Sequence, residues 1–452
     1  MTQQHSGFAK SPRFGDFEAQ RHWMEITVNL PLNEWYVNST KNDLEYWGLD
    51  YPPLTAYHSW LCGKVAQYIG WHDIVALESS RGIETTNTKL FMRSTALLAD
   101  LFIFIPAIIF YVLYCEKSQS LISKSTLLFT CLMQPSMVLI DHGHFQFNSI
   151  CLGLSLWAVN ALIYDHLIIA SILFSLSLNY KQMALYYALP FFFFILRRIY
   201  ERPTAMSRIN KFVQVGLSVI ATFAVCWLPF LIQGCAGDVL KRIFPVHRGL
   251  YEDKVANFWC STSIFIKWNN LFTREQLLKI TMITTLVSCI PFCAYILLSK
   301  SSSMKRLAFG LFGCSMSFYM FSFHVHEKTI LLPLMPALLL LSEFPFEMNL
   351  FSQIATFSMY PLFYKDGIQQ AYYVSMVLQT LFIKSIYGNK LYTASLFGTI
   401  IIQLINSLMT PPARYPDLFT YLCIMYSCAH FVLITAHVSR FQLQQSKKVK
   451  QA

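Results

Sequence analysis

Charged residues are scarce in this sequence. Aspartate, glutamate, lysine and arginine make up 13% of its 452 residues, whereas hydrophobic residues make up 55%. Soluble globular domains contain about 25% charged residues, so the composition excludes that class and predicts an all-α polytopic membrane protein. The first fifteen residues also lack an apolar central region, so we expect no cleavable signal peptide. We therefore expect the first membrane span to target the chain.

Metal-ligand spacing and the marks of a nucleic-acid-binding protein are lacking as well. Most of the twelve cysteines fall inside apolar runs, as Cys131 and Cys226 do, and we interpret them as small core residues. Much of the net charge of +11 lies in short loops and in the C-terminal tail, where basic residues set membrane topology. We expect no nucleic-acid partner, and an anionic lipid-linked substrate is compatible with this charge.

Long apolar segments recur along most of the chain. The hydropathy rule predicts about thirteen membrane helices. They lie at residues 91–114, 125–140, 148–164, 167–180, 185–200, 212–234, 277–298, 307–323, 329–342, 349–363, 370–386, 391–409 and 416–438. We divide the chain into a lumenal loop domain with interfacial helices (1–90), a multi-span domain in the lipid bilayer (91–438) and a basic cytosolic tail (439–452).

The loops between these segments alternate in composition. If residues 1–90 face the lumen, the basic loops and the tail lie on the cytosolic side, in agreement with the positive-inside rule. Asn38 supports this orientation, because it begins an Asn-Ser-Thr glycosylation pattern. The loops on the lumenal side are rich in histidine, acidic and aromatic residues. They lie at residues 141–147, 181–184, 235–276, 324–328, 364–369 and 410–415.

The stretch that begins at Gly15 holds the strongest catalytic candidate. Asp16, Glu18, Arg21 and His22 lie within seven residues, and such groups are costly to bury unless they are paired or functional. We predict that Asp16 is a catalytic base, and that the other three orient it or the substrate. A solvated N-terminal segment is the alternative.

An aromatic stretch at residues 46–58 suits binding of a sugar. It combines a Pro-Pro turn with several rings and one acid. The Tyr51 ring can stack on sugar C–H groups while the Asp50 carboxylate accepts hydrogen bonds from hydroxyls. An interfacial aromatic belt is the alternative interpretation.

Polar residues at 141–148 separate two apolar segments, and we expect His144 and Gln146 there to line the substrate cavity. A zinc site is less favoured, because the sequence fixes no third ligand. Lys181 and Gln182 interrupt a later apolar region. A lysine at this depth either extends its ammonium group to the membrane surface or binds phosphate.

Two later loops add positive charge beside acids. Their candidate residues are Arg248, Asp253, Lys254, His326, Glu327 and Lys328. The first loop suits a pyrophosphate, and an ordinary salt-bridged loop is its alternative. The second loop places imidazole, acid and cation where one span ends and the next begins. This placement favours stabilisation of a leaving-group phosphate over interfacial anchoring.

Six runs together carry a family resemblance: GDFEAQRHW, YWGLDYPPLTAYHS, DHGHFQFNS, YKQMALYY, FPVHRGLYEDKVANFWC and FSFHVHEKTILLP. From Gly15 to its last spans, the chain resembles the dolichyl-phosphate-glucose-dependent α-1,3-glucosyltransferases of the endoplasmic reticulum. The resemblance implies a multi-pass GT-C glycosyltransferase fold in that membrane with a lumenal active site. In that family the first lumenal acid is catalytic, and Asp16 is the matching residue.

The resemblance also implies a reaction. The first glucose would pass from dolichyl phosphate glucose to dolichyl pyrophosphate-linked Man9GlcNAc2, for protein N-glycosylation. A mannose 3-hydroxyl would displace the phosphate with inversion. Lys328 and His326 would stabilise the leaving group, with Arg248 or Lys181 as a further candidate. Asp16 and Glu18 could hold a divalent ion, but phosphate already leaves readily, so we expect no metal cofactor.

Two other functions remain open. The sister enzyme that adds the second glucose looks similar, but it lacks the residue order found here at 18–22 and 46–48. A lipid-linked sugar transporter usually places its polar groups at mid-bilayer and shows repeat symmetry, whereas here they gather on one side.

Family members also have a membrane span before the catalytic loop. The fourteen polar residues ahead of Gly15 lead us to expect either a lost span or a lumenal N-terminus.

Overall fold

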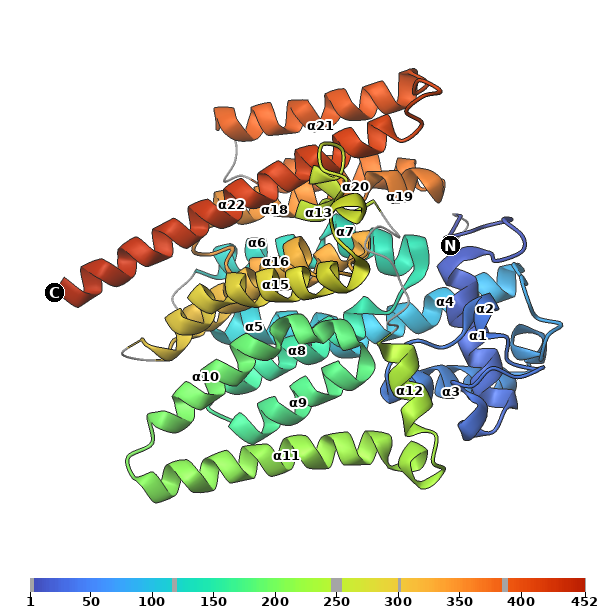
Figure 1. Cartoon of the computed structure of the whole chain (residues 1–452), viewed down its shortest axis with the longest axis horizontal. Helices are drawn as coiled ribbons and strands as arrows, with labels where there is room; N and C mark the ends of the chain where they lie inside the picture. Colours follow the sequence, from blue (N-terminus) through green and yellow to red (C-terminus); the bar gives the residue numbers. More distant parts are fainter. Residues whose placement is uncertain (1–3, 116–119, 245–253, 300–301, 384–388, 452) are drawn as a thin grey trace.

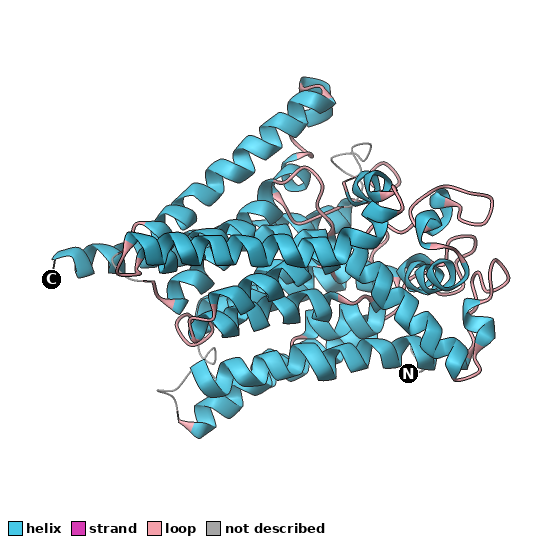
Figure 2. Ribbon diagram, turned by 90° about the horizontal axis from the view of Figure 1, so that it is seen from below, coloured by secondary structure: helices cyan, strands magenta, loops and turns pink. Residues whose placement is uncertain are grey.

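The computed structural model describes residues 4–115, 120–244, 254–299, 302–383 and 389–451. Every regular element in these ranges is a helix, and no strand occurs in them (Figure 2). Many of the long helices run roughly along the long axis of the molecule (Figure 1). Helices suit an apolar chain, because each one satisfies its backbone hydrogen bonds internally when lipid surrounds it.

The N-terminal part is built around two packed helices, α1 (Gly15–Asn29) and α3 (Pro53–Tyr68). Gly63 permits their close approach, because a Cβ at that position would lie 2.4 Å from Cγ2 of Val28. Three short elements complete this part: η1 (Leu32–Glu34), α2 (Leu44–Trp47) and η2 (His72–Val75).

The apolar body follows and accounts for most of the chain. Its first half comprises α4 (Thr86–Ala99), η3 (Asp100–Phe104), α5 (Ile105–Cys115), α6 (Leu121–Leu132), α7 (Pro135–Val138), η4 (Leu139–Phe145), α8 (Asn148–Ile163), α9 (Leu167–Tyr180), η5 (Gln182–Tyr187), α10 (Ala188–Tyr200), α11 (Ala205–Ile232) and α12 (Ala236–Ile243). Its second half comprises α13 (Phe258–Thr262), α14 (Trp268–Leu271), α15 (Arg274–Leu297), α16 (Met304–Phe321), η6 (Glu327–Ile330), α17 (Leu331–Leu339), α18 (Pro345–Ser358), α19 (Tyr360–Lys365), α20 (Gln369–Phe382), α21 (Lys390–Leu408) and α22 (Leu418–Gln451). Two of these elements, η3 and η4, are π-helices.

The polytopic membrane character predicted from the sequence is confirmed. Within the described ranges, six helices are long and apolar enough to cross a membrane. They are Thr86–Tyr114, Gln182–Tyr200, Ala205–Ile232, Arg274–Leu297, Lys390–Leu408 and Leu418–Gln442. The segment predicted at 125–140 is divided, because α6 ends at Leu132 and Pro135 begins α7. Proline has no backbone N–H to continue the preceding helix.

The two ends of the molecule differ in composition. The N-terminal part lies at one end of the long axis, whereas the C-terminus lies at the other (Figure 1). The connection between α10 and α11, which contains Arg202, also lies at the C-terminal end, as does the start of α16 with Lys305. The basic connections are therefore separated from α1 by the length of the helices.

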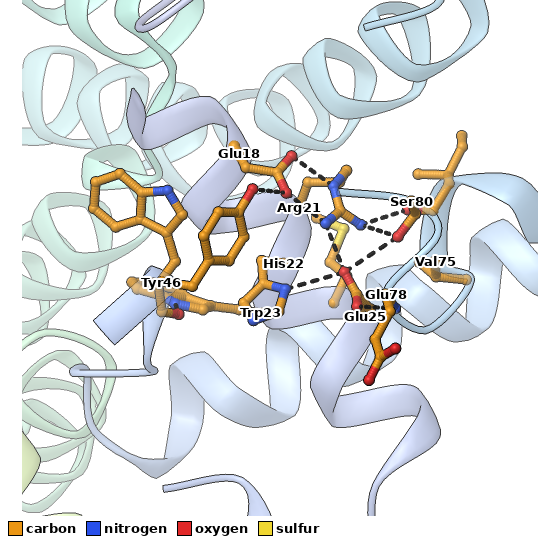
Figure 3. A network of polar contacts seen from close by, with 12 residues as sticks. Glu18, Arg21, His22, Trp23, Glu25, Tyr46, Val75, Glu78 and Ser80 are labelled. Carbon is orange, nitrogen blue, oxygen red and sulfur yellow. Dashed lines mark hydrogen bonds and ion pairs between the residues drawn. The ribbon is translucent and has the colours of Figure 1, made fainter. Parts of the chain in front are cut away.

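A buried ion network joins α1 to the segment after α3 (Figure 3). The fully buried Arg21 donates hydrogen bonds to both carboxylate oxygens of Glu18 (2.6 and 2.7 Å) and to Oε2 of Glu25 (2.6 Å). Its Nη1 atom donates to Ser80 Oγ (2.5 Å) and to the carbonyl of Ile74 (2.9 Å). Five hydrogen bonds from one guanidinium therefore hold three segments together.

Two further side chains complete this network. Nδ1 of His22 lies 3.0 Å from Oε2 of Glu25, and the hydroxyl of Tyr46 donates to Oε1 of Glu18 at 2.9 Å. Burial alone would raise the pKa of Glu25, but the hydrogen bond with His22 and the charge of Arg21 lower it to about 2. Glu25 is therefore ionised at neutral pH and holds the guanidinium as a full negative charge.

Replacing Arg21 with alanine should destabilise the protein by about 3–5 kcal/mol, because two buried carboxylates would lose their counter-charge. Thermal unfolding in detergent would show a large fall in Tm. Lys241→Ala is the matched control, since its ion pair with Asp238 is solvent-exposed and should contribute less than about 1 kcal/mol. Similar Tm values for the two variants would contradict a stabilising role for the network.

Candidate active site

Asp16 lies in the first turn of α1, directly after a tight N-terminal loop. Gly7 and Gly15 both have φ of 68°, and a Cβ on Gly7 would lie 2.2 Å from the backbone nitrogen of Gly15. Glycine, which has no Cβ, accepts both this positive φ and this close contact between the two backbone segments. The loop therefore determines where α1 begins. It also places the Asp16 carboxylate near the positive end of the helix dipole.

Ser6 joins this loop to η4. Its hydroxyl oxygen accepts a hydrogen bond from the backbone N–H of Asp16 at 2.9 Å, and its own N–H donates to the carbonyl of His144 at 3.2 Å. A single residue thus fixes two backbone segments relative to each other. The side chains of Asp16 and His144 meet as a result.

Three donors converge on one oxygen of Asp16. Nε2 of Gln146 donates to Oδ2 at 2.6 Å, Nε2 of His144 lies 3.1 Å from it, and Nζ of Lys328 donates to the same atom. Among the residues that the structure describes, none donates to Oδ1. The Asp16 side chain is 23% exposed, so its neighbours enclose it only in part.

The charges around Asp16 keep it ionised. Burial would raise the pKa of its carboxyl group, but the positive charges of Lys328 and His144, and their hydrogen bonds, hold that pKa well below its usual range. Asp16 is therefore a carboxylate throughout the neutral range.

His144 lies between two carboxylates. Its Nδ1 atom is 2.6 Å from Oδ2 of Asp366, which follows α19, and its Nε2 atom faces Asp16. Burial and then the charge of Lys328 lower the pKa of His144, but Asp16 and Asp366 outweigh them and the net shift is upward. Asp366 thereby fixes the ring orientation that directs Nε2 towards Asp16.

The turn that carries His144 and Gln146 is strained. Phe145, between them, is fully buried and has φ of 88°. Bulky residues rarely adopt this left-handed region, and the conformation costs on the order of 1–3 kcal/mol. The turn brings both neighbouring side chains onto Asp16, so the strain lies in the segment that shapes the site.

Lys181 fixes the orientation of the Gln146 amide. Its Nζ donates to Oε1 of Gln146 at 3.4 Å and to Oδ1 of Asn148 at 2.7 Å. The amide nitrogen of Gln146 is then directed to Asp16. Burial lowers the pKa of Lys181 to about 8, and the ammonium group also lies 4.8 Å from the centre of the Tyr51 ring.

The structure brings together part of the predicted residue set. His144, Gln146 and Lys328 contact Asp16, and Lys181 contacts Gln146. The hydrogen bonds of Glu18, Arg21 and His22 instead connect to Glu25, Tyr46 and Ser80 (Figure 3). Successive helical positions face different directions, so neighbours of Asp16 in sequence are not its neighbours in space.

Other predicted residues lie at varied places. The Gln182 amide donates to the carbonyl of Asp50 at 3.2 Å, and Nε2 of His326 lies 3.1 Å from that of His324. Glu327 begins η6.

The remaining predicted residues lie away from the Asp16 carboxylate or outside the described part of the chain. Lys254 forms an ion pair with Asp417 at 2.5 Å, and the side chain of Asn38 is exposed. Arg248 and Asp253 lie outside the described residues. Within the described ranges, no three His, Cys, Asp or Glu side chains converge as metal ligands would.

The sequence does not single out two residues of this site, Ser6 and Asp366. Asp366 belongs to a loop expected on the same side as Asp16, but a lone acid gives no indication of its partner. Ser6 lies in a short polar segment without a motif. The contacts that define both residues join segments far apart in the chain, and spacing carries no signal for them.

Comparison with known proteins gives a consistent result. A model of the ALG6, ALG8 glycosyltransferase family matches residues 8–437. A relative from Dictyostelium discoideum, named a probable dolichyl pyrophosphate Man9GlcNAc2 alpha-1,3-glucosyltransferase, is 43% identical over 466 residues, covering 95% of this chain and 89% of its own length. The Gallus gallus protein named dolichyl pyrophosphate Man9GlcNAc2 alpha-1,3-glucosyltransferase is 41% identical over 480 residues (98% and 93%). A probable enzyme of the same name from Arabidopsis thaliana is 39% identical over 465 residues (97% and 86%).

The family match includes every residue that contacts the Asp16 carboxylate, from η4 to η6. Membership of a glycosyltransferase family also explains why polar groups gather at one end of the helices. The alternative function, a transporter, is therefore not needed to explain them. The chain belongs to the ALG6, ALG8 glycosyltransferase family.

Proposed function

We propose that this glycosyltransferase moves the first glucose from dolichyl phosphate glucose, in α-1,3 linkage, onto dolichyl pyrophosphate-linked Man9GlcNAc2. The names of the three relatives support the acceptor and the linkage. The donor, the endoplasmic reticulum location, the lumenal site and the GT-C fold are proposed from the sequence resemblance, and the count of about thirteen spans from the hydropathy rule. One observation carries the chemistry: an ionised carboxylate with one oxygen held by three donors, and the other without a donor among the described residues.

In the proposed reaction Asp16 is the general base. A mannose 3-hydroxyl attacks C1 of the β-linked glucosyl phosphate, the C1–O bond to phosphate breaks, and the hydroxyl proton passes to Oδ1 of Asp16. The product is α-linked because the single displacement inverts C1. A hydroxyl is a poor nucleophile near neutral pH, so a positioned carboxylate lowers the barrier.

A carboxylate with a lowered pKa is a weak base, and the proposed transition state tolerates this. Glycosyl transfer passes through an oxocarbenium-like centre. The attacking hydroxyl loses its proton after bonding to that centre has begun, when it is already strongly acidic. Asp16 therefore needs to be ionised and correctly placed more than it needs to be strongly basic, and the three donors on Oδ2 serve both needs.

The departing dolichyl phosphate needs positive charge close to Asp16. Lys328 supplies it in this proposal, with His326 two residues earlier in the chain. Preorganised cations stabilise charge that develops on a leaving group. The phosphate is a competent leaving group without protonation, so no general acid is required and we propose transfer without a metal cofactor.

Asp16→Asn should lower kcat by about 10²–10⁴-fold, the usual contribution of a general base. Transfer of radiolabelled glucose from dolichyl phosphate glucose to lipid-linked Man9GlcNAc2 by the purified protein would measure this. Glu45→Gln, which changes an exposed acid of the same N-terminal part, should leave the rate unchanged. A near-normal rate for Asp16→Asn would exclude Asp16 as the base.

The same assay distinguishes the two related enzymes by their acceptor. Preference of the wild-type protein for a monoglucosylated acceptor would favour the sister enzyme that adds the second glucose.

Lys328→Met should shift the acid limb of the pH–rate profile upwards by about 1–3 pH units, the usual effect of losing a neighbouring opposite charge. Asp16 has a lowered pKa, so activity is present above that pKa and is lost as the pH falls through it. Without Lys328 the pKa of Asp16 rises and the loss occurs at higher pH. Lys305→Met, which removes the partner of Glu343, should not move the limb. An unshifted limb in Lys328→Met would refute this coupling.

Chelation provides a separate test of the metal-free proposal. The purified enzyme should keep its full transfer rate after treatment with EDTA, because Lys328 and His326 supply the charge that a divalent ion would otherwise provide. Initial rates before and after chelation give the measurement. Loss of activity that manganese restores would show that the transfer needs a metal.

A further inference from the structure

A second pair of a carboxylate and an imidazole lies apart from the Asp16 site. Oδ2 of Asp100 and Nε2 of His142 are 2.5 Å apart, and the two side chains are 18% and 26% exposed. Asp100 belongs to η3, inside the candidate span Thr86–Tyr114. Ionisable residues within membrane spans are costly, and they generally mark functional positions. The reaction proposed above makes no use of this pair.

Both partners lie on π-helices. Such helices are rare and occur frequently at functional sites. The η4 element carries three polar side chains with separate anchors. Asp141 accepts hydrogen bonds from the Asn148 side chain (2.7 Å) and the Ser149 backbone (2.8 Å). His142 meets Asp100, and His144 meets Asp16 and Asp366.

These anchors surround the strained turn at Phe145. A residue at such a φ keeps its conformation only when its surroundings over-determine it. Asp141 ties η4 to the start of α8, and Asp366 ties it to the C-terminal half of the chain. Asp100 ties it to the first membrane span through a side-chain pair, and η4 also packs against α4 of that span.

We propose that Asp100 and His142 form a positioning pair that holds η4 so that His144 and Gln146 reach Asp16. The proposal rests on the proposed function, because its readout is the rate of glucose transfer. Neither residue of the pair contacts the Asp16 carboxylate, so their effect passes through the backbone of η4. A pair that merely neutralises a buried charge would affect stability alone.

The surroundings of Asp100 leave room for substitutions. Its side chain lines a cavity of about 50 Å³ together with Leu132 and Met137. Space beside Asp100 reduces the steric cost of the larger imidazole in Asp100→His. The exchanged double variant Asp100→His/His142→Asp, which restores the pair in reverse, is therefore a suitable test of positioning.

In Asp100→Asn the kcat per folded molecule should fall roughly 10–100-fold, as expected when a catalytic group is displaced by about an ångström. KM for the lipid-linked acceptor should stay within about twofold, because the lost interaction acts on the transition state. The exchanged double variant should recover most of the lost kcat. Asp165→Asn, which breaks the pair with Arg202, is the control and should keep the wild-type kcat.

Folded protein is quantified by Tm and by monodispersity in detergent, and kcat is expressed per folded molecule. Unchanged kcat in Asp100→Asn, with only a lower Tm, would overturn the proposal. If the exchanged variant does not accumulate, Asp100→Glu decides: it should retain more kcat than Asp100→Asn, and equal values would overturn positioning by charge. Asp16→Asn and the wild-type protein are assayed in parallel. An active Asp16→Asn enzyme would exclude Asp16 as the base, and a wild-type protein without glucose transfer would defeat the proposed function, whatever Asp100 does.

Discussion

The mutual neutralisation of Asp16, Lys328 and His144 is the interaction on which the site depends. Each of these charges alone would lose several kcal/mol of hydration on burial, and each offsets the others where they meet. Lys328 is 312 residues from Asp16 and His144 is 128 residues from it. The cluster therefore forms only where the folded helical body brings these distant segments together. The packing of apolar helices is the physical precondition of the charged site, although its three charged groups lie on α1, η4 and η6.

Helix α1 separates two functions that are adjacent in sequence. Asp16, in the first turn, faces η4 and η6 and keeps part of its surface exposed. Two residues later, Glu18 is buried and bound to Arg21. A step of two residues turns a helix by about 200°, so the two carboxylates face nearly opposite directions. In the proposed reaction one acid meets the substrate, while the other fixes the helix that carries the first.

The sequence predicts the fold better than it predicts the site. Apolar runs identify the helices because burial in lipid requires them, and the resemblance identifies Asp16. Glu18, Arg21 and His22 show the limit of sequence proximity, since a cluster of charges does not reveal which members bind one another. Asp366 and Ser6 show the opposite limit. Their partners come from distant segments, so neither periodicity nor spacing could indicate them. Lys328 lies between these cases: topology places it on the correct side, but only the folded chain brings it to Asp16.

Lys328 has two anionic partners in the proposed reaction, the Asp16 carboxylate and the donor phosphate. It can therefore link the events at these two groups. In the structure its ammonium group binds Asp16 and holds the pKa of that carboxyl group low. A donor phosphate that arrives beside Lys328 competes for the same charge. As the leaving group gains negative charge, Lys328 is drawn more strongly to the phosphate, and its hold on Asp16 weakens at the moment when the carboxylate must accept a proton. His144 and Gln146 remain in contact with Oδ2 throughout, so Asp16 can gain basicity without losing its position. Departure of the phosphate and acceptance of the proton are then coupled through a single side chain.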